Sequence, residues 1–245
     1  MRILLTADPS AAGDLVAREI ARAVDRDPAT VLGVATGGSP EPVYRSLARA
    51  GVRLPHATAF ALDEYVGLPP GHPESYRAVL QRLVQLPLGL AADRLHVPDG
   101  AAADPDAEAA AYDARIDEAG GVGLQLLGIG RNGHIAFNEP GSALDTPTRV
   151  VRLTEDTRRA NARFFTGIDD VPERAITQGL GTIARARRLM LIATTEDKAD
   201  AVRALVRGPV TSDLPASILR IHPDATVVLT PEAATGLSEE EFEAA

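Results

Sequence analysis

Cysteine and tryptophan are absent from the 245-residue chain, and aromatic residues make up only 4% of it. Without cysteine there can be no disulfide, no thiolate nucleophile and no zinc–sulfur centre. The sequence contains no run of about 18 apolar residues, the length a helix needs to cross a bilayer. The apolar stretch near the start is too short for a signal peptide, and we therefore expect a cytoplasmic protein.

An excess of positive charge is also absent, because 34 acidic residues outnumber 25 basic ones and the formal net charge is −9. We therefore expect neither nucleic acid nor an anionic membrane as a partner. The 25 basic residues include a single lysine, Lys198. It stands where a helix is predicted to begin, and a cation at that end of a helix is favourable if an anion binds there. Chance survival of one lysine codon explains the observation equally well.

Strand-like and helix-like segments alternate along almost the whole chain. This alternation predicts an α/β fold with an open, mostly parallel, Rossmann-like sheet and helices on both faces. No linker divides the chain, so we expect one domain spanning residues 1–245. The predicted strands cover residues 2–6, 31–35, 57–62, 94–97, 124–128, 150–153, 189–193 and 226–229, and helices are predicted near 10–25, 40–47, 74–84, 106–119, 155–165 and 196–206.

Polar loops follow three of these strands, at residues 36–39, 63–65 and 131–139. Because the carboxyl ends of parallel strands share one edge, we expect the loops to converge there. Gly37, Gly38 and Ser39 would present backbone N–H groups at a helix start, which suits a phosphate. The alternative is a plain turn in which Ser39 caps the helix.

The other two loops carry groups that can move protons. Asp63 and Glu64 follow a strand, and either could act as a general base or belong to a solvated acidic turn. His134 with Glu139 suits proton shuttling, and the alternative is a glycine turn with a core histidine. Asn132 and Asn138 add to the polar side chains that crowd this loop, which favours a site.

The glycines of Leu124–Gly141 match G-x-G-x-x-G, the pattern of dinucleotide-binding loops. That pattern requires a helix after its third glycine, and Pro140 with Gly141 would interrupt one. His134, Glu139 and Asp63 show no spacing typical of a metal site. We therefore expect no metal and no cofactor, and the residues favour proton transfer on a small phosphorylated substrate, next to a carbonyl.

Longer motifs resemble the glucosamine-6-phosphate deaminase family over about residues 32–231. They are ATGGSPEPVYRSL, FALDEYVGLPPGHPESY, LGIGRNGHIAFNEPGS, LTEDTRRANARFF and VPERAITQGLGTI, in this order. The resemblance implies an enzyme of amino-sugar catabolism that converts glucosamine 6-phosphate and water into fructose 6-phosphate and ammonia. It also implies an open α/β sheet with a mobile lid within about residues 150–181.

The resemblance assigns a role to each candidate residue. Asp63 would be the enolising base, His134 would open the sugar ring, and Glu139 would orient His134. Asn132 stands where the family often has an aspartate that also serves ring opening. The residues that would bind the substrate phosphate are Gly37, Gly38, Ser39, Arg163 and Lys198.

Relatives activated by N-acetylglucosamine 6-phosphate carry an Arg-x-Lys motif and paired serines. Arg149 and Ser142 match, whereas Val151 and Ala143 replace the lysine and the second serine. We therefore predict weak or absent activation. A homo-oligomer is left open, with a monomer or dimer more in keeping with these replacements than a hexamer.

Three other functions are left open. A 6-phosphogluconolactonase would share the fold, but it is expected to lack the DEYVGL and FNEPG elements. A sugar-phosphate sensor would need a DNA-binding module, and residues 1–30 supply only one strand and one helix. Deamination of galactosamine 6-phosphate differs from the gluco reaction by the contact to one hydroxyl.

Overall fold

The computed structural model describes residues 1–243 and has a central seven-stranded parallel sheet. Its strand order is β1-β10-β9-β6-β2-β3-β5, and every neighbouring pair is parallel. The strands are β1 (Arg2–Leu5), β2 (Val31–Val34), β3 (Thr58–Ala61), β5 (Leu95–His96), β6 (Leu124–Leu127), β9 (Leu189–Ala193) and β10 (Ala225–Leu229). The predicted α/β class with a mostly parallel sheet is confirmed.

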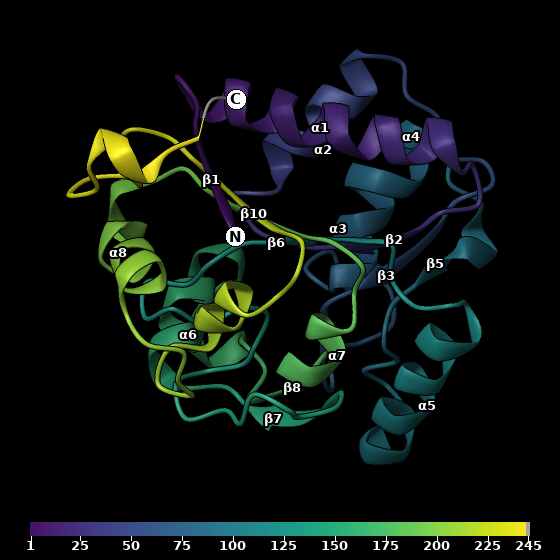
Figure 1. The fold of residues 1–245 in the computed structure, drawn as a ribbon. Helices are drawn as coiled ribbons and strands as arrows, with labels where there is room; N and C mark the ends of the chain where they lie inside the picture. The colour runs from purple at the N-terminus through teal and green to yellow at the C-terminus, as the bar shows by residue number, and fades with distance from the viewer. Residues whose placement is uncertain (244–245) are drawn as a thin grey trace.

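Helices cover both faces of this sheet, with α1 and α2 on one face and α5 and α7 on the other (Figure 1). The α-helices are α1 (Pro9–Arg26), α2 (Glu41–Arg49), α3 (Tyr76–Leu80), α4 (Leu86–Leu88), α5 (Pro105–Glu118), α6 (Glu155–Asn161), α7 (Leu180–Ala184) and α8 (Ala199–Arg207). A π-helical turn, Gln81–Gln85, separates α3 from α4, so the helix predicted over 74–84 is three short pieces. Asp8 caps α1 by accepting a hydrogen bond from the Ala11 N–H.

A second, antiparallel sheet has the order β4-β8-β7, with β4 (Asp63–Tyr65), β7 (Arg149–Arg152) and β8 (Arg174–Thr177). Residues 63–65 are therefore a strand and not the loop that the sequence predicted. The reason is that they pair with β8, a strand that sequence patterns did not reveal. The stretch from β7 to β8, residues 149–177, is called the β7–β8 segment below and includes α6.

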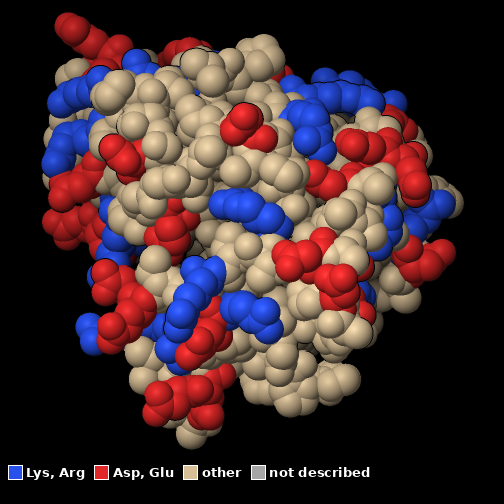
Figure 2. All heavy atoms as spheres, turned by 90° about the horizontal axis from the view of Figure 1, so that it is seen from below, with Lys and Arg blue, Asp and Glu red and all other residues tan. Residues whose placement is uncertain are grey.

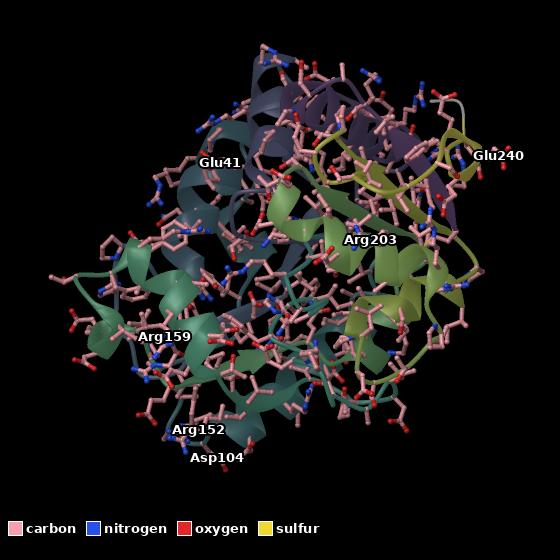
Figure 3. The ribbon with its side chains drawn as sticks, turned by 90° about the vertical axis from the view of Figure 1, so that its left-hand side faces the viewer. Glu41, Asp104, Arg152, Arg159, Arg203 and Glu240 are labelled. Atoms are coloured by element: carbon pink, nitrogen blue, oxygen red, sulfur yellow. The ribbon has the colours of Figure 1, made fainter. Side chains whose placement is uncertain are left out.

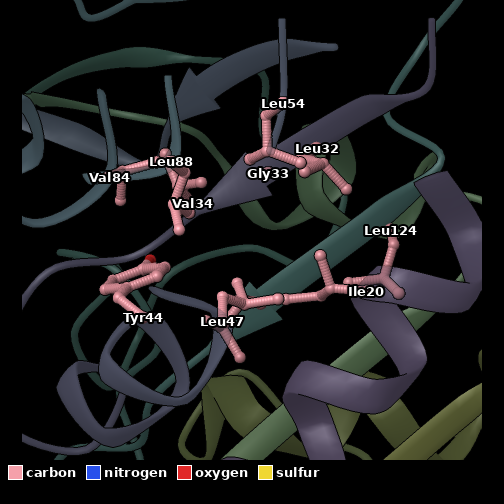
Figure 4. Close-up of a pocket in the computed structure, with 11 residues that line it drawn as sticks. Ile20, Leu32, Gly33, Val34, Tyr44, Leu47, Leu54, Val84, Leu88 and Leu124 are labelled. Carbon is pink, nitrogen blue, oxygen red and sulfur yellow. The ribbon is translucent and has the colours of Figure 1, made fainter. Parts of the chain in front are cut away.

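The hydrophobic core lies between the helices and the parallel sheet. Every residue of β6, β9 and β10 is buried, as expected for strands covered on both faces. One void of about 10 Å³ remains beneath α1 and α2, near Ile20 and Leu47 (Figure 4). It is lined by apolar groups and is at the lower limit for holding one water molecule. It is a packing defect and not a ligand site.

The surface is charged but mixed in sign. On the face seen from below, acidic and basic side chains are interspersed without a large area of one sign (Figure 2). Within residues 1–243 no helix has the length and apolar character needed to cross a membrane.

Candidate active site

The strand order of the parallel sheet reverses between β2 and β6. The chain leaves β2 toward β3 on one side, and it leaves β6 toward β9 on the other. Open α/β sheets bind ligands in the crevice at such a reversal, outside the carboxyl ends of the strands. The loops that follow β2 and β6 are the ones that carry Gly37–Ser39 and Asn132–Glu139, so the topology places both at this crevice.

The loop after β2 presents free backbone donors. The N–H groups of Gly37, Gly38 and Ser39 donate to no acceptor in the described part of the chain, and no side chain caps α2. The interpretation in which Ser39 caps this helix is therefore wrong. Gly37 has a φ of 93°, a conformation that disfavours other residues. The loop can thus bind an anion with its backbone.

Asp63 lies where the chain passes from one sheet to the other. Leu62 donates its N–H to Val34 of the parallel sheet, and Asp63 pairs with Thr177 of the antiparallel sheet. The side chain is 6% exposed and receives no hydrogen bond from the described residues. Burial, and secondarily the charge of Glu64, raise the pKa of Asp63 well above its ordinary value. The result is a carboxylate with high proton affinity on a rigid support.

Glu64, its neighbour, has a structural environment. Its Oε1 accepts hydrogen bonds from the N–H groups of Tyr65 and Tyr76 at 2.8 and 2.9 Å, and its Oε2 accepts one from Arg77 at 2.9 Å. These bonds fasten the start of α3 to β4. Burial raises the pKa of Glu64, and the three backbone donors partly offset that rise. Only Asp63 of the two carboxylates is free to act as a base.

His134, Asn132 and Glu139 form a hydrogen-bonded relay in the loop after β6. Nδ1 of His134 lies 2.7 Å from Oδ1 of Asn132, and Nδ2 of Asn132 donates to Oε2 of Glu139 at 2.7 Å. Glu139 itself lies 3.6 Å from Nδ1, so the amide mediates its effect on the ring. Because Oδ1 can only accept, Nδ1 of His134 carries a hydrogen and Nε2 is left free for a ligand.

Glu139 is held in its charged form. Burial alone would raise its pKa, but the imidazole of His134 at 3.6 Å and hydrogen bonds from Thr157 and Asn132 lower the pKa of Glu139 to about 2. Gly130 is required next to this relay, since a Cβ there would lie 2.2 Å from Cε1 of His134. The ring therefore packs directly over the backbone of the loop.

Asn138 and Arg149 fix the rest of this loop. Asn138 is completely buried and donates Nδ2 to the carbonyls of Ile135 and Gln178. Its Oδ1 accepts a hydrogen bond from Arg149 at 2.7 Å, and Arg149 also contacts Ser142 at 3.3 Å. A tight turn is closed by the bridge between Ile135 and Asn138, and no helix follows the third glycine. The absence of that helix in this described stretch argues against a dinucleotide-binding loop.

Two tyrosines join the separate loops. The Tyr76 hydroxyl donates to that of Tyr65 at 3.3 Å and also interacts with Thr36 in the loop after β2. Tyr65 in turn accepts a hydrogen bond from Asn161 of α6 at 2.9 Å. Both tyrosine pKa values are raised, chiefly by burial, with Asp63 contributing. This row of contacts passes beside Asp63 and reaches the β7–β8 segment.

Lys198 lies at the carboxyl end of β9, on the same sheet edge. Its Nζ pairs with Asp197 at 3.1 Å, and its side chain is 20% exposed. Arg131 of the loop after β6 is close enough to lower the pKa of Asp197, although burial is the largest influence and raises it. The Lys198 turn and the relay loop follow two neighbouring strands, β9 and β6.

Arg163, the remaining candidate for phosphate binding, lies in a short 3₁₀ turn of the β7–β8 segment. Its guanidinium lies over the ring of Phe164 at 4.7 Å, and the side chain is exposed. No hydrogen bond or ion pair within residues 1–243 connects it to Lys198 or to Gly37–Ser39. Arg152 and Arg159 of the same segment lie at the periphery of the molecule (Figure 3).

Thr154, Thr157 and Tyr76 contact the site but were not singled out from the sequence. Thr154 and Thr157 bond to Glu139 across 15 and 18 residues of chain. The T-x-x-T spacing signals a helix start, but nothing in it indicates which carboxylate the hydroxyls meet. No cluster of three or more metal-ligating side chains occurs in the described chain.

Comparison with known proteins identifies a family. The family model for glucosamine-6-phosphate isomerases and 6-phosphogluconolactonase matches residues 8–228. A glucosamine-6-phosphate deaminase of Streptomyces coelicolor is 53% identical over 97% of this chain and 93% of its own length. One from Rhodopirellula baltica is 49% identical, with coverages of 96% and 95%.

Solved structures give the same relationship. A structure described as a monomeric glucosamine-6-phosphate deaminase superposes with a TM-score of 0.94 at 40% identity, covering 96% of this chain and 99% of its own. The 6-phosphogluconolactonase of Trypanosoma brucei superposes with a TM-score of 0.79 at 18% identity, with coverages of 97% and 98%. The second similarity shows a common fold only.

Proposed function

Because the chain belongs to the family of glucosamine-6-phosphate isomerases and 6-phosphogluconolactonases, we propose a mechanism in which Asp63 and His134 divide the proton transfers. The enzyme converts glucosamine 6-phosphate and water into fructose 6-phosphate and ammonia. The observation that supports the mechanism is an unpartnered carboxylate after β3 and a hydrogen-bonded histidine relay after β6, both following the carboxyl ends of strands of the parallel sheet. A positioned acid–base group of this kind contributes about 10²–10⁴-fold to the rate.

The relay opens the sugar ring. Nε2 of His134 removes the proton from the O1 hydroxyl as the C1–O5 bond breaks, and it supplies a proton to O5. Asn132 holds the ring tautomer that leaves Nε2 free, and the charge of Glu139, transmitted through the amide, stabilises the imidazolium that forms. Catalysis here depends on Nδ1 remaining a donor throughout.

Asp63 then acts on the open-chain aldehyde. Its carboxylate removes the C2 proton, C1 and C2 become joined by a double bond, and the C1–O1 bond becomes single as O1 takes a proton from water. Asp63 then returns its proton to C1 while the lone pair of the nitrogen forms a double bond to C2. The C2–N bond is now an imine, to which water adds before ammonia leaves and the ketone remains. The high proton affinity of Asp63 suits it to a carbon acid.

Backbone donors of Gly37, Gly38 and Ser39, with Lys198, bind the substrate phosphate in this proposal. That anchor positions C2 against Asp63. The β7–β8 segment is the lid, within about residues 150–181, and Arg163 can join the phosphate only if this segment moves. The enzyme acts in the cytoplasm without a cofactor.

The assay that tests the function measures ammonia release. Purified enzyme is given glucosamine 6-phosphate, galactosamine 6-phosphate and 6-phosphogluconolactone in parallel. We expect ammonia from the gluco substrate and no lactone hydrolysis above the spontaneous rate. Lactone hydrolysis without deamination would overturn the proposal, and a preference for the galacto substrate would correct the epimer.

Removal of the Lys198 ammonium is expected to weaken substrate binding. Lys198→Ala should weaken the binding free energy of fructose 6-phosphate by about 1.5–3 kcal/mol, the value of a hydrogen bond to a charged group. Calorimetric titration measures it. Arg203→Ala, which removes a cation from the same helix (Figure 3), is the control and should bind normally. Equal affinities for Lys198→Ala and the unaltered enzyme would exclude this role.

The chain also acts as a monomer without activation by N-acetylglucosamine 6-phosphate in this proposal. A relative of 40% identity is described as monomeric. The Arg149 guanidinium is already bonded to Asn138 and Ser142. Val151 supplies no charge beside it, so an effector phosphate would find no second cation there.

A further inference from the structure

Two hydroxyls of one helical turn bond to the carboxylate of Glu139. Thr154 Oγ1 donates to Oε1 at 3.2 Å, and Thr157 Oγ1 donates to the same oxygen. Thr154 is also the N-cap of α6, where it accepts the Thr157 N–H at 3.2 Å. Thr157 is 6% exposed. The two hydroxyls are therefore held by the helix start itself.

These bonds fix the plane of the carboxylate. The last torsion of a glutamate side chain has only broad preferences, so without them the carboxylate plane would turn at little cost. With both hydroxyls on Oε1, Oε2 is left to accept Nδ2 of Asn132 at 2.7 Å. Oδ1 of the same amide then meets Nδ1 of His134 at 2.7 Å. The orientation of the histidine ring thus depends on a contact that lies outside its own loop.

Both hydroxyls belong to the β7–β8 segment, whereas the relay belongs to the loop after β6. The other end of α6 is attached through Asn161 to the Tyr65 hydroxyl. When α6 lies in this position, its start brings the two hydroxyls to Glu139 while its end contacts Tyr65. Movement of α6 away from this position would remove the hydroxyls from Glu139. A closing element that completes a catalytic arrangement is a common way to couple closure with chemistry.

We propose that Thr157, assisted by Thr154, is a positioning residue that makes ring opening by His134 conditional on the seating of α6. This inference rests on the proposed function, because it concerns the relay that opens the ring. Neither threonine contacts the reacting atoms. Their effect passes entirely through Glu139, and that path is what an experiment can isolate.

A double-mutant cycle on the full-length enzyme provides the test. Ammonia release from glucosamine 6-phosphate is measured for the unaltered enzyme, Thr157→Val, Thr157→Ser, Glu139→Gln and the Thr157→Val/Glu139→Gln pair. Thr148→Val is the matched control, since Thr148 is equally buried and donates its hydroxyl to the carboxylate of Asp113, away from the site. Thermal unfolding of each variant separates loss of fold from loss of rate.

We expect Thr157→Val to lower kcat about tenfold, a part of what a positioned acid–base group supplies. Thr157→Ser should restore the rate, and Thr148→Val should lose stability without losing rate. In the Glu139→Gln background, Thr157→Val should change kcat by less than about twofold because the effect passes through Glu139. An equal loss in both backgrounds, no loss at all, or failure of serine to restore the rate would overturn the inference. An unaltered enzyme that releases no ammonia would instead overturn the proposed function.

Discussion

Asp63→Asn is expected to abolish deamination while leaving sugar phosphate bound. Asparagine has the same shape but cannot accept a proton, so C2 of the open-chain substrate keeps its hydrogen. Loss of a positioned base corresponds to about 10²–10⁴-fold in rate. The phosphate-binding groups are untouched, and the dissociation constant of fructose 6-phosphate should therefore be unchanged. Ammonia release and calorimetric titration measure the two quantities.

Asp113→Asn is the matched control for this variant. Asp113 lies on α5 and accepts hydrogen bonds from Thr148, which directly precedes β7, and from Thr182 on α7. Its substitution should affect stability and leave turnover normal. Normal turnover of Asp63→Asn would remove the base assignment, and loss of turnover together with loss of binding would indicate a structural role instead.

Asp63→Asn should also increase the stability of the protein at neutral and alkaline pH. The pKa of Asp63 in the folded state is raised above its value in the unfolded state. At a pH between these two pKa values the folded protein therefore binds the proton more tightly than the unfolded chain does. Stability then falls as pH rises through this window, because the charged carboxylate is unfavourable where it is buried. Asp63→Asn lacks this penalty. Its thermal midpoint relative to the unaltered enzyme should therefore rise from pH 5 to pH 8, and a constant difference would contradict the raised pKa.

The parallel sheet could be predicted from the sequence because its strands are local apolar runs. Leu189–Ala193 was predicted with its observed bounds, and strands buried on both faces leave this pattern whatever they pair with. The antiparallel sheet could not be predicted in the same way. Arg174–Thr177 is four residues long and begins with an exposed arginine. Its strand character comes from pairing with β4, which is more than a hundred residues earlier in the chain.

The site shows the same division between local and distant information. That the loops after β2 and β6 meet follows from sheet topology alone. The separate roles of Asp63 and Glu64 do not, because they depend on which carboxylate meets the N–H groups of α3. The sequence likewise placed Glu139 beside His134, and only the coordinates reveal that the Asn132 amide lies between them.

Glu64→Ala is expected to destabilise the fold more than any other substitution considered. It leaves three N–H groups without their acceptor, that of Tyr65 in a buried setting and those of Tyr76 and Arg77 in a part-buried one. Unsatisfied buried donors cost about 1–3 kcal/mol each, and partial hydration of α3 reduces the sum to about 3 kcal/mol. For a domain of this size the thermal midpoint should fall by about 6–12 °C.

Glu118→Ala, an exposed acid at the end of α5, is the control and should stay within about 0.5 kcal/mol of the unaltered enzyme. Chemical denaturation of both variants measures the difference. A loss below about 1 kcal/mol for Glu64→Ala is in the range of a single ordinary hydrogen bond. It would mean that water replaces the carboxylate at α3. Substitution of these two adjacent acids should thus change stability in opposite directions. Removing the charge of Asp63 stabilises the enzyme and abolishes turnover, because its carboxylate receives no hydrogen bond from the described residues. Removing Glu64 destabilises the attachment of α3, the helix that packs beside the base.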